Sequence, residues 1–297
     1  MVKKWPGMIA VVLLLAMVAL GGCAGSTAQH GAGASAARDG TAPLTIQMLD
    51  VGQGDALLIR TAEQTVMIDT GDVDERDKLR AALKKAGVTT IDKLIITHPH
   101  ADHMGGADVL FQEFEVRKVY DNGQPTTSKL YRSYLKTIKD KKIDHEVLAA
   151  GKSLDFGGGV SFKVLSPTGV PDEQNKDLNN NSIVGRLAFG DFSMLFTGDS
   201  QAEAEMSMVK FYGKKLKSTI LKAPHHGSRT SSSAKYLDDV APEAVLISLG
   251  AGNEYGHPHK VTLERYAKRD IKVYRTDQNG TITITSDGSS YKIEGEK

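Results

Sequence analysis

The chain has 297 residues, of which 40% are hydrophobic and 25% are charged. This composition is typical of a globular protein and excludes a disordered or fibrous chain. Lysine and arginine number 37 against 36 aspartate and glutamate, so the net charge is +1. The chain as a whole therefore offers no general attraction for nucleic acid, and any such partner must be recognised by a local group of residues.

The N-terminal segment has the pattern of an export signal. Lys3 and Lys4 precede an apolar run over residues 8–20, which is too short to span a bilayer and suits a signal peptide. The next residues, Leu20-Gly21-Gly22-Cys23, resemble the lipobox of bacterial lipoproteins, in which the cysteine is acylated. A simple small-residue cleavage site is the alternative. We expect residues 1–22 to be a lipoprotein signal peptide and the protein to be exported, anchored to the membrane through lipidated Cys23 and facing outward.

Cys23 is the single cysteine of the chain, so no disulfide can form within it. Stability must then come from packing and from bound metal. Residues 23–43 are mostly alanine, glycine, serine and threonine and are predicted to be a flexible tether. Residues 44–297 are expected to form one folded domain.

The domain is predicted to alternate short strands with amphipathic helices. In chain order we expect strands at 44–51, 56–60 and 65–69, a helix at 75–86, a strand at 93–97, a helix at 107–114, a strand at 116–120 and a helix at 130–139. After strands at 161–165, 183–189 and 193–197 come a helix at 202–211, strands at 218–223 and 244–249, a helix near 262–268, and strands at 272–275 and 281–285. Residues 169–181 are predicted to be a loop. This order favours an α+β fold with two packed sheets and helices outside.

Four side chains that can bind metal lie within six residues, directly after the apolar run at 93–97. They are His98, His100, Asp102 and His103. Side chains two apart on a strand point the same way, so His98 and His100 can share one metal, while Asp102 and His103 can face a second from the following turn. Imidazole and carboxylate ligands together suit transition metals rather than calcium or magnesium. The sequence predicts one or two divalent metal ions, Mn or Zn.

This stretch resembles the HxHxDH signature of the metallo-β-lactamase superfamily. Asp69-Thr70-Gly71 is similar to its early strand-end aspartate, and Thr197-Gly198-Asp199 to the acidic residue that bridges its two metals. Four further motifs resemble the soluble C-terminal domain of ComEC competence proteins, and they are Leu49-Asp50-Val51-Gly52-Gln53-Gly54-Asp55-Ala56, Asn180-Asn181-Ser182, Lys222-Ala223-Pro224-His225-His226-Gly227-Ser228 and Tyr255-Gly256-His257-Pro258. The resemblance covers roughly residues 44–293 and implies the αββα sandwich of the metallo-β-lactamase fold.

The resemblance also implies two metal positions of unequal strength. Where many superfamily members supply a third histidine to the first metal, this chain has Asn180-Asn181-Ser182, and an amide oxygen binds a transition metal more weakly than imidazole. We expect the first site to consist of His98, His100 and Asp199 and to be the weaker one. The tighter second site is expected to consist of Asp102, His103, Asp199 and either His225 or His226. Asn181, Ser182 and Ser228 are expected to contact substrate.

The pair His225-His226 is expected to lie at the end of the strand predicted at 218–223. Because side chains alternate along a strand, one of the two is expected to reach the metal and the other to contact substrate. The sequence leaves open which histidine is which. A packed structural role for the second histidine is the alternative.

A divalent cation lowers the pKa of bound water to about 7, which makes hydrolysis the natural reaction of such a site. The sequence contains neither a Ser-His-Asp pattern nor a phosphate-binding GxxxxGK[ST] loop, so a protein nucleophile is not supported. The resemblance implies that Asp102 is both a metal ligand and the proton acceptor. His226 joins it as a candidate catalytic residue.

Phosphodiesters are the favoured substrates. Gly105-Gly106 are predicted to open a helix whose amides face an anion. His257 with Tyr255 can orient phosphate oxygens or protonate the leaving group, although a turn with a packed tyrosine is the alternative. Basic residues that can contact a nucleic-acid backbone, or simply form a solvated face, are Lys210, Lys214, Lys215, Lys217, Lys222 and Arg229.

Two classes of function remain open. The first is a hydrolase: a nuclease acting on single-stranded DNA at the cell surface, as the ComEC resemblance implies, or a phosphodiesterase acting on small esters or cell-wall phosphocholine. The second is a DNA-binding or assembly module with weak chemistry. The hydrolase is favoured because Asp102 and Asp199 are both present and a purely structural site needs no open coordination position. A β-lactamase is disfavoured by the ComEC-like motifs.

Overall fold

The structure is a computed structural model that describes residues 43–171 and 177–297. The predicted signal peptide, Cys23 and nearly all of the predicted tether lie outside these residues. In the part of the chain that is described, no helix is long and apolar enough to cross a membrane.

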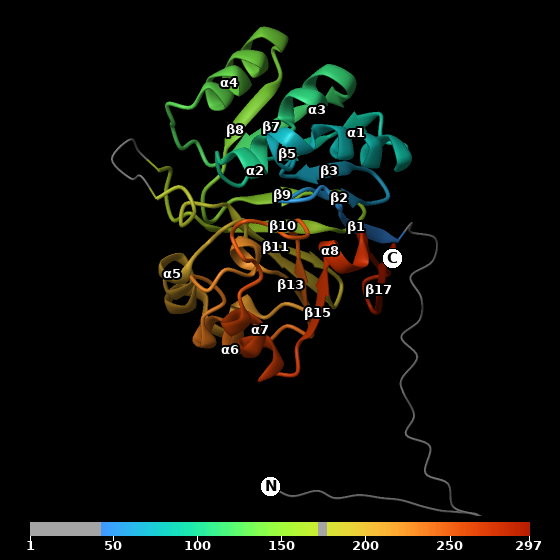
Figure 1. The fold of residues 1–297 in the computed structure, drawn as a ribbon. Helices are drawn as coiled ribbons and strands as arrows, with labels where there is room; N and C mark the ends of the chain where they lie inside the picture. The colour runs from blue at the N-terminus through green and yellow to red at the C-terminus, as the bar shows by residue number, and fades with distance from the viewer. Residues whose placement is uncertain (1–42, 172–176) are drawn as a thin grey trace, which may run out of the picture. The chain divides into compact units, whose positions relative to one another are not determined.

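Two mixed sheets form the centre of the domain (Figure 1). The first has the strand order β17-β16-β1-β2-β3-β5-β7-β8, with bounds Leu44–Met48 (β1), Leu57–Arg60 (β2), Thr65–Ile68 (β3), Lys93–Ile95 (β5), Lys118–Asp121 (β7), Asp144–Val147 (β8), Ile282–Ser286 (β16) and Tyr291–Gly295 (β17). The second has the order β15-β14-β13-β12-β11-β10-β9, with bounds Ser153–Asp155 (β9), Ser161–Ser166 (β10), Val184–Phe189 (β11), Phe192–Phe196 (β12), Ile220–Lys222 (β13), Ala244–Ile247 (β14) and Lys272–Arg275 (β15). Thr90–Ile91 (β4) and Glu115–Val116 (β6) form a small separate pair.

Alternation along the strands places the two sheets face to face. In β1, Leu44, Ile46 and Met48 are buried in the central cluster, and in β12 the matching residues are Phe192, Met194 and Phe196. The residues between them point the other way, as Leu195 does into the outer cluster of the second sheet. This is the period of two that a strand requires when both of its faces are covered.

Helices cover the outer face of each sheet. Arg76–Lys85 (α1), Ala107–Glu113 (α3) and Lys129–Lys141 (α4) pack against the first sheet, and Ala202–Tyr212 (α5), Ala234–Val240 (α6) and Lys260–Ala267 (α7) against the second (Figure 1). The remaining short elements are Ala101–Met104 (α2), Thr276–Asn279 (α8), Val73–Glu75 (η1), Gly213–Leu216 (η2) and Pro224–Gly227 (η3). The predicted αββα sandwich is confirmed.

The sequence missed several short elements. Helix α6 and strands β8, β9 and β17 were not predicted, because each is short and β8, β9 and β17 lie at or near sheet edges where exposed residues break the apolar pattern. The strand predicted at 218–223 is shorter than expected and ends at Lys222. This difference matters because the two histidines that follow lie in a turn.

Candidate metal centre

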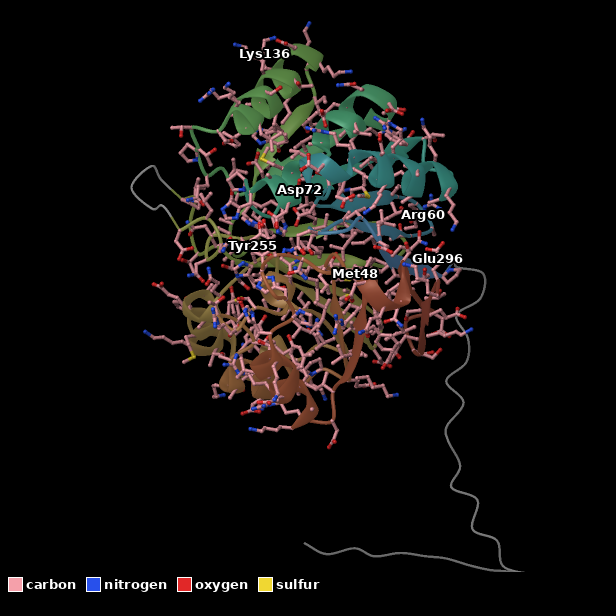
Figure 2. The ribbon with its side chains drawn as sticks, viewed as in Figure 1. Met48, Arg60, Asp72, Lys136, Tyr255 and Glu296 are labelled. Atoms are coloured by element: carbon pink, nitrogen blue, oxygen red, sulfur yellow. The ribbon has the colours of Figure 1, made fainter. Side chains whose placement is uncertain are left out.

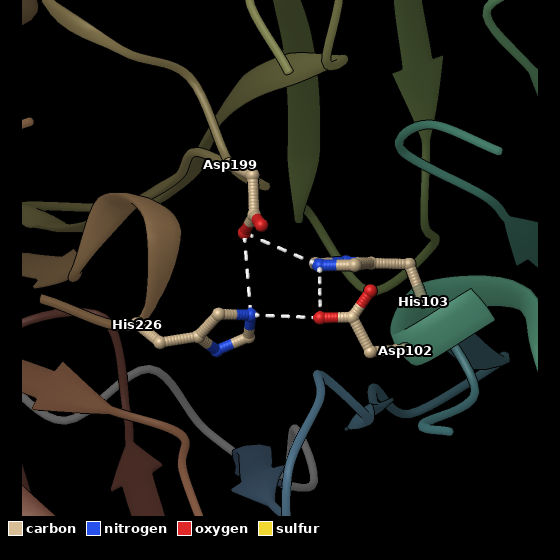
Figure 3. Close-up of side chains that lie close together, drawn as sticks. All are labelled: Asp102, His103, Asp199 and His226. Carbon is tan, nitrogen blue, oxygen red and sulfur yellow. Dashed lines mark ion pairs between the residues drawn. The ribbon is translucent and has the colours of Figure 1, made fainter. Parts of the chain in front are cut away.

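Four side chains converge at the ends of three strands. Asp102 and His103 lie in α2, which follows β5, while Asp199 follows β12 and His226 lies in η3 after β13. One ligand atom from each of the four lies within 4.8 Å of the others. The Nε2 atom of His103 is 3.2 Å from Asp199 Oδ1, and the Nε2 atom of His226 is 3.3 Å from Asp102 Oδ2 and 3.5 Å from Asp199 Oδ1 (Figure 3). We call these four residues the metal cluster.

A tight left-handed turn brings His226 into the metal cluster. His225 and His226 have φ angles of 50° and 52°, so the prediction that they end a strand is wrong. Left-handed conformations in residues other than glycine cost about 1 kcal/mol or more and cluster at functional sites. His226 is buried, whereas the His225 side chain is 23% exposed and its Nε2 atom lies 3.7 Å from Asp199 Oδ2. The turn therefore separates the two histidines, with His226 in the cluster and His225 beside it.

Hydrogen bonds behind the cluster fix the orientation of both imidazoles. The Nδ1 atom of His103 lies 2.8 Å from Asp69 Oδ2, and that of His226 lies 2.8 Å from the Ser248 carbonyl oxygen. When each Nδ1 carries the donated proton, each Nε2 presents its lone pair to the cluster. Both Nε2 atoms and Asp199 Oδ1 are buried without a hydrogen-bond partner among the described residues.

Asp69 itself is held by Thr97, whose backbone amide and hydroxyl each donate to the carboxylate at 2.7 Å. We expect Asp69→Asn to lower metal affinity by about 10- to 100-fold, because the amide can present a donor to His103 Nδ1 and move the imidazole proton to Nε2. Competition with a chromophoric chelator measures the loss. Asp140→Asn, a surface change in α4, serves as the control. Equal metal affinities for Asp69→Asn and wild type would show that Asp69 does not orient His103.

The metal cluster and the buried residues behind it, together called the centre, are strongly acidic. It contains four carboxyl groups, from Asp55, Asp69, Asp102 and Asp199. One buried lysine, Lys222, forms an ion pair with Asp55. Burial disfavours the imidazolium of His226, but Asp199 and Asp55 outweigh burial and raise its pKa to about 10. The same balance against burial, with Asp199 and Asp102 as the largest contributors, raises the pKa of His103 well above its usual value.

Neighbouring charges also shift the pKa values of the acidic residues in the centre. Burial opposes ionisation of Asp199 and Asp102, but His103 and His226 outweigh burial and hold the pKa of each carboxyl below its usual range. The centre thus lacks positive charge, which either two protons on the imidazoles or one divalent cation can supply. Two nitrogen and two oxygen donors with orphaned buried atoms fit a transition metal.

Metal binding is therefore expected to release about two protons per ion at pH 7, since His103 and His226 must lose the Nε2 proton to bind metal. Below the raised pKa values both imidazoles are charged, so metal affinity should rise with pH. Isothermal titration of the metal in buffers of different ionisation enthalpy counts the protons. A binding enthalpy that is the same in every buffer would show that none is released.

His98 and His100 lie beside the metal cluster but outside its set of four. His98 Nε2 is 2.9 Å from His100 Nδ1, so the two imidazoles are adjacent as predicted from their spacing. Burial lowers the pKa of both rings, which leaves them neutral at pH 7. Neither histidine belongs to a group of described residues whose ligand atoms all lie within 4.8 Å of one another. Occupancy of this first site stays a prediction.

The metal cluster opens into a cavity of about 290 Å³. Of the residues expected from the sequence, those that line it are His100, Asp102, Asp199, His225, His226, Tyr255 and His257. Figure 2 shows Tyr255 and Asp72 at the level where the two helix-covered halves meet. Gln53, Asp72 and Asn179 also line the cavity and were given no role from the sequence, although Gln53 belongs to a ComEC-like motif and Asp72 follows the Asp69-Thr70-Gly71 motif.

The residues expected to contact substrate, Asn181, Ser182 and Ser228, do not line this cavity. Ser182 is fully buried, and its hydroxyl accepts a hydrogen bond from the Asp199 amide at 3.1 Å. The hydroxyl of Ser228 is 2.9 Å from that of Thr230. Asn181 is buried and lines a different cavity, while Asn179 lines the one at the metal cluster. Ser182 therefore positions Asp199 from behind, which a sequence motif does not reveal.

Gly105 and Gly106 do not supply amides to the predicted anion site. The Gly105 amide donates to the Gly71 carbonyl at 2.9 Å and the Gly106 amide to the Thr70 hydroxyl at 3.1 Å, so neither is available to a phosphate. A Cβ atom on Gly106 would lie 2.4 Å from the Thr70 carbonyl oxygen. These glycines allow the metal-binding turn to pack closely against the Asp69-Thr70-Gly71 turn.

Lys222 is not available to a nucleic-acid backbone, because its side chain is only 1% exposed. Its ammonium group contacts Asp55 and donates to the Gly198 carbonyl at 2.9 Å. The other predicted basic residues, Lys210, Lys214, Lys215, Lys217 and Arg229, are exposed and lie outside the cavity lining. A DNA contact by these residues stays a prediction.

Comparisons with known proteins agree with this geometry. A family described as the metallo-beta-lactamase superfamily matches residues 49–251. ComE operon protein 3 of Bacillus subtilis is 31% identical over 255 residues, which cover 80% of this chain and 32% of that protein. Competence protein ComA of Neisseria gonorrhoeae is 33% identical over 238 residues, which cover 80% of this chain and 31% of that protein. The chain thus spans about one third of the length of these relatives, and the resemblance to competence proteins is confirmed.

One solved structure illustrates the shared fold. CmlA, a diiron β-hydroxylase from Streptomyces venezuelae, superposes with a TM-score of 0.51 at 16% identity. The match covers 78% of this chain and 52% of the CmlA chain. At this identity the likeness concerns the fold alone.

Proposed function

The chain belongs to the metallo-β-lactamase superfamily, and from that premise we propose that it hydrolyses phosphodiester bonds, acting as a nuclease on single-stranded DNA. One observation carries the proposal. Two buried imidazoles and two carboxylates converge beside an open cavity, and both Nε2 atoms and Asp199 Oδ1 lack hydrogen-bond partners among the described residues. A purely structural metal site is closed, whereas this one faces a cavity with room for substrate.

The metal cluster supplies the reaction centre. Asp102, His103, Asp199 and His226 would hold the ion, and His98 with His100 would complete a weaker second position. A divalent cation there lowers the pKa of a water ligand toward 7 and polarises a phosphoryl oxygen. Asp102 is the most exposed of the four, with a side chain 25% exposed against at most 3% for the others. It is therefore the member of the metal cluster most accessible to water, which supports the proton-acceptor role that the resemblance implies.

His257 lies on the cavity wall above the cluster. Burial, together with His226 and His225, lowers the pKa of its imidazole to about 4, so the ring is neutral at pH 7. A neutral ring donates a hydrogen bond to a phosphate oxygen but is a poor acid. Of the two roles expected from the sequence, orientation of the phosphate is favoured over protonation of the leaving group.

DNA is the substrate that the relatives support. One relative is named as a competence protein and the other as a protein of the ComE operon, and the ComEC resemblance implies contact with DNA. A small phosphodiester is the competing substrate, since 290 Å³ at the cluster holds one phosphodiester group as readily as a strand passing over it. The cavity itself does not discriminate between them.

The test uses the full chain loaded with Mn or Zn in separate samples. We expect degradation of a single-stranded oligonucleotide that stops with chelator and with Asp102→Asn. Turnover of a nitrophenyl phosphodiester with DNA untouched would replace the nuclease with a small-ester phosphodiesterase. DNA binding without turnover under every metal would refute the hydrolase in favour of a DNA-binding module.

We also propose that the protein acts outside the cytoplasm as a lipoprotein anchored at Cys23. Support comes from the sequence pattern of residues 3–23 alone. Mass spectrometry of the N-terminal peptide tests this, with a diacylglyceryl modification on Cys23 expected. Release of the protein into the medium by Cys23→Ser would agree, and an unmodified N-terminus would contradict the proposal.

A further inference from the structure

We propose that Tyr255 is a stacking platform that holds a nucleobase of single-stranded substrate beside the metal cluster. This inference rests on the proposed function and names the part of the substrate that the cavity recognises. The sequence predicts that Tyr255 acts with His257 on the phosphate, whereas the structure favours a contact with the base.

Three rings form a continuous stack that leads from the metal cluster to the surface. The ring of His257 lies 6.1 Å from that of His226 with an interplanar angle of 26°. The ring of Tyr255 lies 5.6 Å from that of His257 at 21°. His226 is buried, while Tyr255 is 56% exposed. The outermost member of the stack therefore offers an aromatic ring to whatever occupies the mouth of the cavity.

Hydrogen bonds hold the turn that carries Tyr255. The side chain of Asn253 donates to the His257 carbonyl at 2.8 Å and to the Gly250 carbonyl at 3.0 Å, and it accepts from the His257 amide at 3.0 Å. At the far end of the turn, the His259 amide donates to the Gly227 carbonyl at 3.0 Å. The turn is thereby tied to the segment that carries His226. Stacking on a ring that is already ordered costs little conformational entropy.

The charges of the cavity argue for a base contact. Among the described residues that line it, none is lysine or arginine, whereas Asp72, Asp102 and Asp199 are acidic. In the metal-loaded protein, where His226 has lost its extra proton, a phosphate backbone thus finds neither lysine nor arginine there, and attraction beyond the metal must come from uncharged contacts. Aromatic stacking is such a contact, and it accepts every base because each has a π face.

The experiment measures binding separately from turnover. The full chain, loaded with Mn, is titrated with a single-stranded oligonucleotide that has phosphorothioate linkages and one 2-aminopurine. A second oligonucleotide of the same length and backbone carries abasic sites in place of the bases. The variants are Tyr255→Leu and Tyr255→Phe, and Phe211→Leu, which changes another exposed aromatic residue on α5, is the matched control.

We expect Tyr255→Leu to weaken binding of the base-containing strand by about 5- to 150-fold and to abolish quenching of 2-aminopurine. Tyr255→Phe and Phe211→Leu should stay within about twofold of wild type, since the ring rather than the hydroxyl makes the contact. The abasic strand should bind all four proteins equally.

Three results would overturn the inference: unchanged affinity in Tyr255→Leu, equal losses for the base-containing and abasic strands, or a Tyr255→Phe loss as large as that of Tyr255→Leu. Wild-type protein that binds neither strand would overturn it as well. Stacking without hydrolysis of an ordinary oligonucleotide would instead refute only the proposed nuclease, so the two failures are distinguishable.

Discussion

Asp199→Asn is expected to abolish high-affinity metal binding and to reduce hydrolysis by more than about 100-fold, because loss of a mere partner behind a ligand already costs 10- to 100-fold. Asp199 lies 3.2 Å from His103 Nε2 and 3.5 Å from His226 Nε2, so its carboxylate contacts both imidazoles of the metal cluster and is nearly buried. The amide has nearly the same shape but no charge. It leaves the centre with one fewer negative charge to hold a cation.

The fold should survive this change. The Asp199 backbone amide still donates to the Ser182 hydroxyl. None of the four residues of the metal cluster belongs to the hydrophobic core between the two sheets. Metal content by mass spectrometry and hydrolysis of single-stranded DNA are measured on the same preparation, with circular dichroism as the check on folding. Asp191→Asn, an exposed change in the turn before β12, is the control. Retention of stoichiometric metal and activity by Asp199→Asn would refute its place in the site.

Lys222→Met is expected to lower the free energy of unfolding by about 3–5 kcal/mol, because it removes the nearest cation of the buried Asp55 carboxylate. Burial disfavours the ammonium form of Lys222, but Asp55 and Asp199 outweigh burial and raise its pKa. Both side chains of the pair are 1% exposed. Removing one partner of such a pair leaves a desolvated charge, which costs far more than the pair itself contributes.

Chemical denaturation of the metal-free protein measures the change. The double variant Lys222→Met with Asp55→Asn should recover part of the loss, since no unpaired buried charge then remains. Lys136→Met removes the partner of Asp140 in an exposed ion pair on α4 and should cost at most about 1 kcal/mol. A Lys222→Met protein within 1 kcal/mol of wild type would show that Asp55 finds another cation or is protonated.

The sequence alone predicted the part of the site whose residues are close together in the chain. His98, His100, Asp102 and His103 follow one strand within six residues, so their proximity needed no knowledge of the fold. The strands of the central layer were predicted because residues such as Ile46 and Met194 alternate with outward-facing neighbours. The resemblance then supplied Asp199 and the histidine pair, which spacing along the chain does not connect to His103.

Other features depended on contacts between distant segments. The pair Lys222–Asp55 joins residues 167 positions apart in the chain, so Lys222 looked like a surface cation until the fold buried it. The choice between His225 and His226 depended on left-handed backbone angles that strand alternation does not anticipate. Asn179 and Asn181 both belong to a loop rich in polar residues, and tertiary structure alone decides which one faces the metal cluster.

A metal titration of activity tests most directly whether an ion in the metal cluster is required for hydrolysis. Metal-free full chain receives increasing Mn or Zn, and bound metal and degradation of single-stranded DNA are measured at every step. We predict that the first equivalent binds at Asp102, His103, Asp199 and His226 and restores most of the hydrolysis. DNA degradation that is the same in the metal-free and metal-loaded samples would contradict the account.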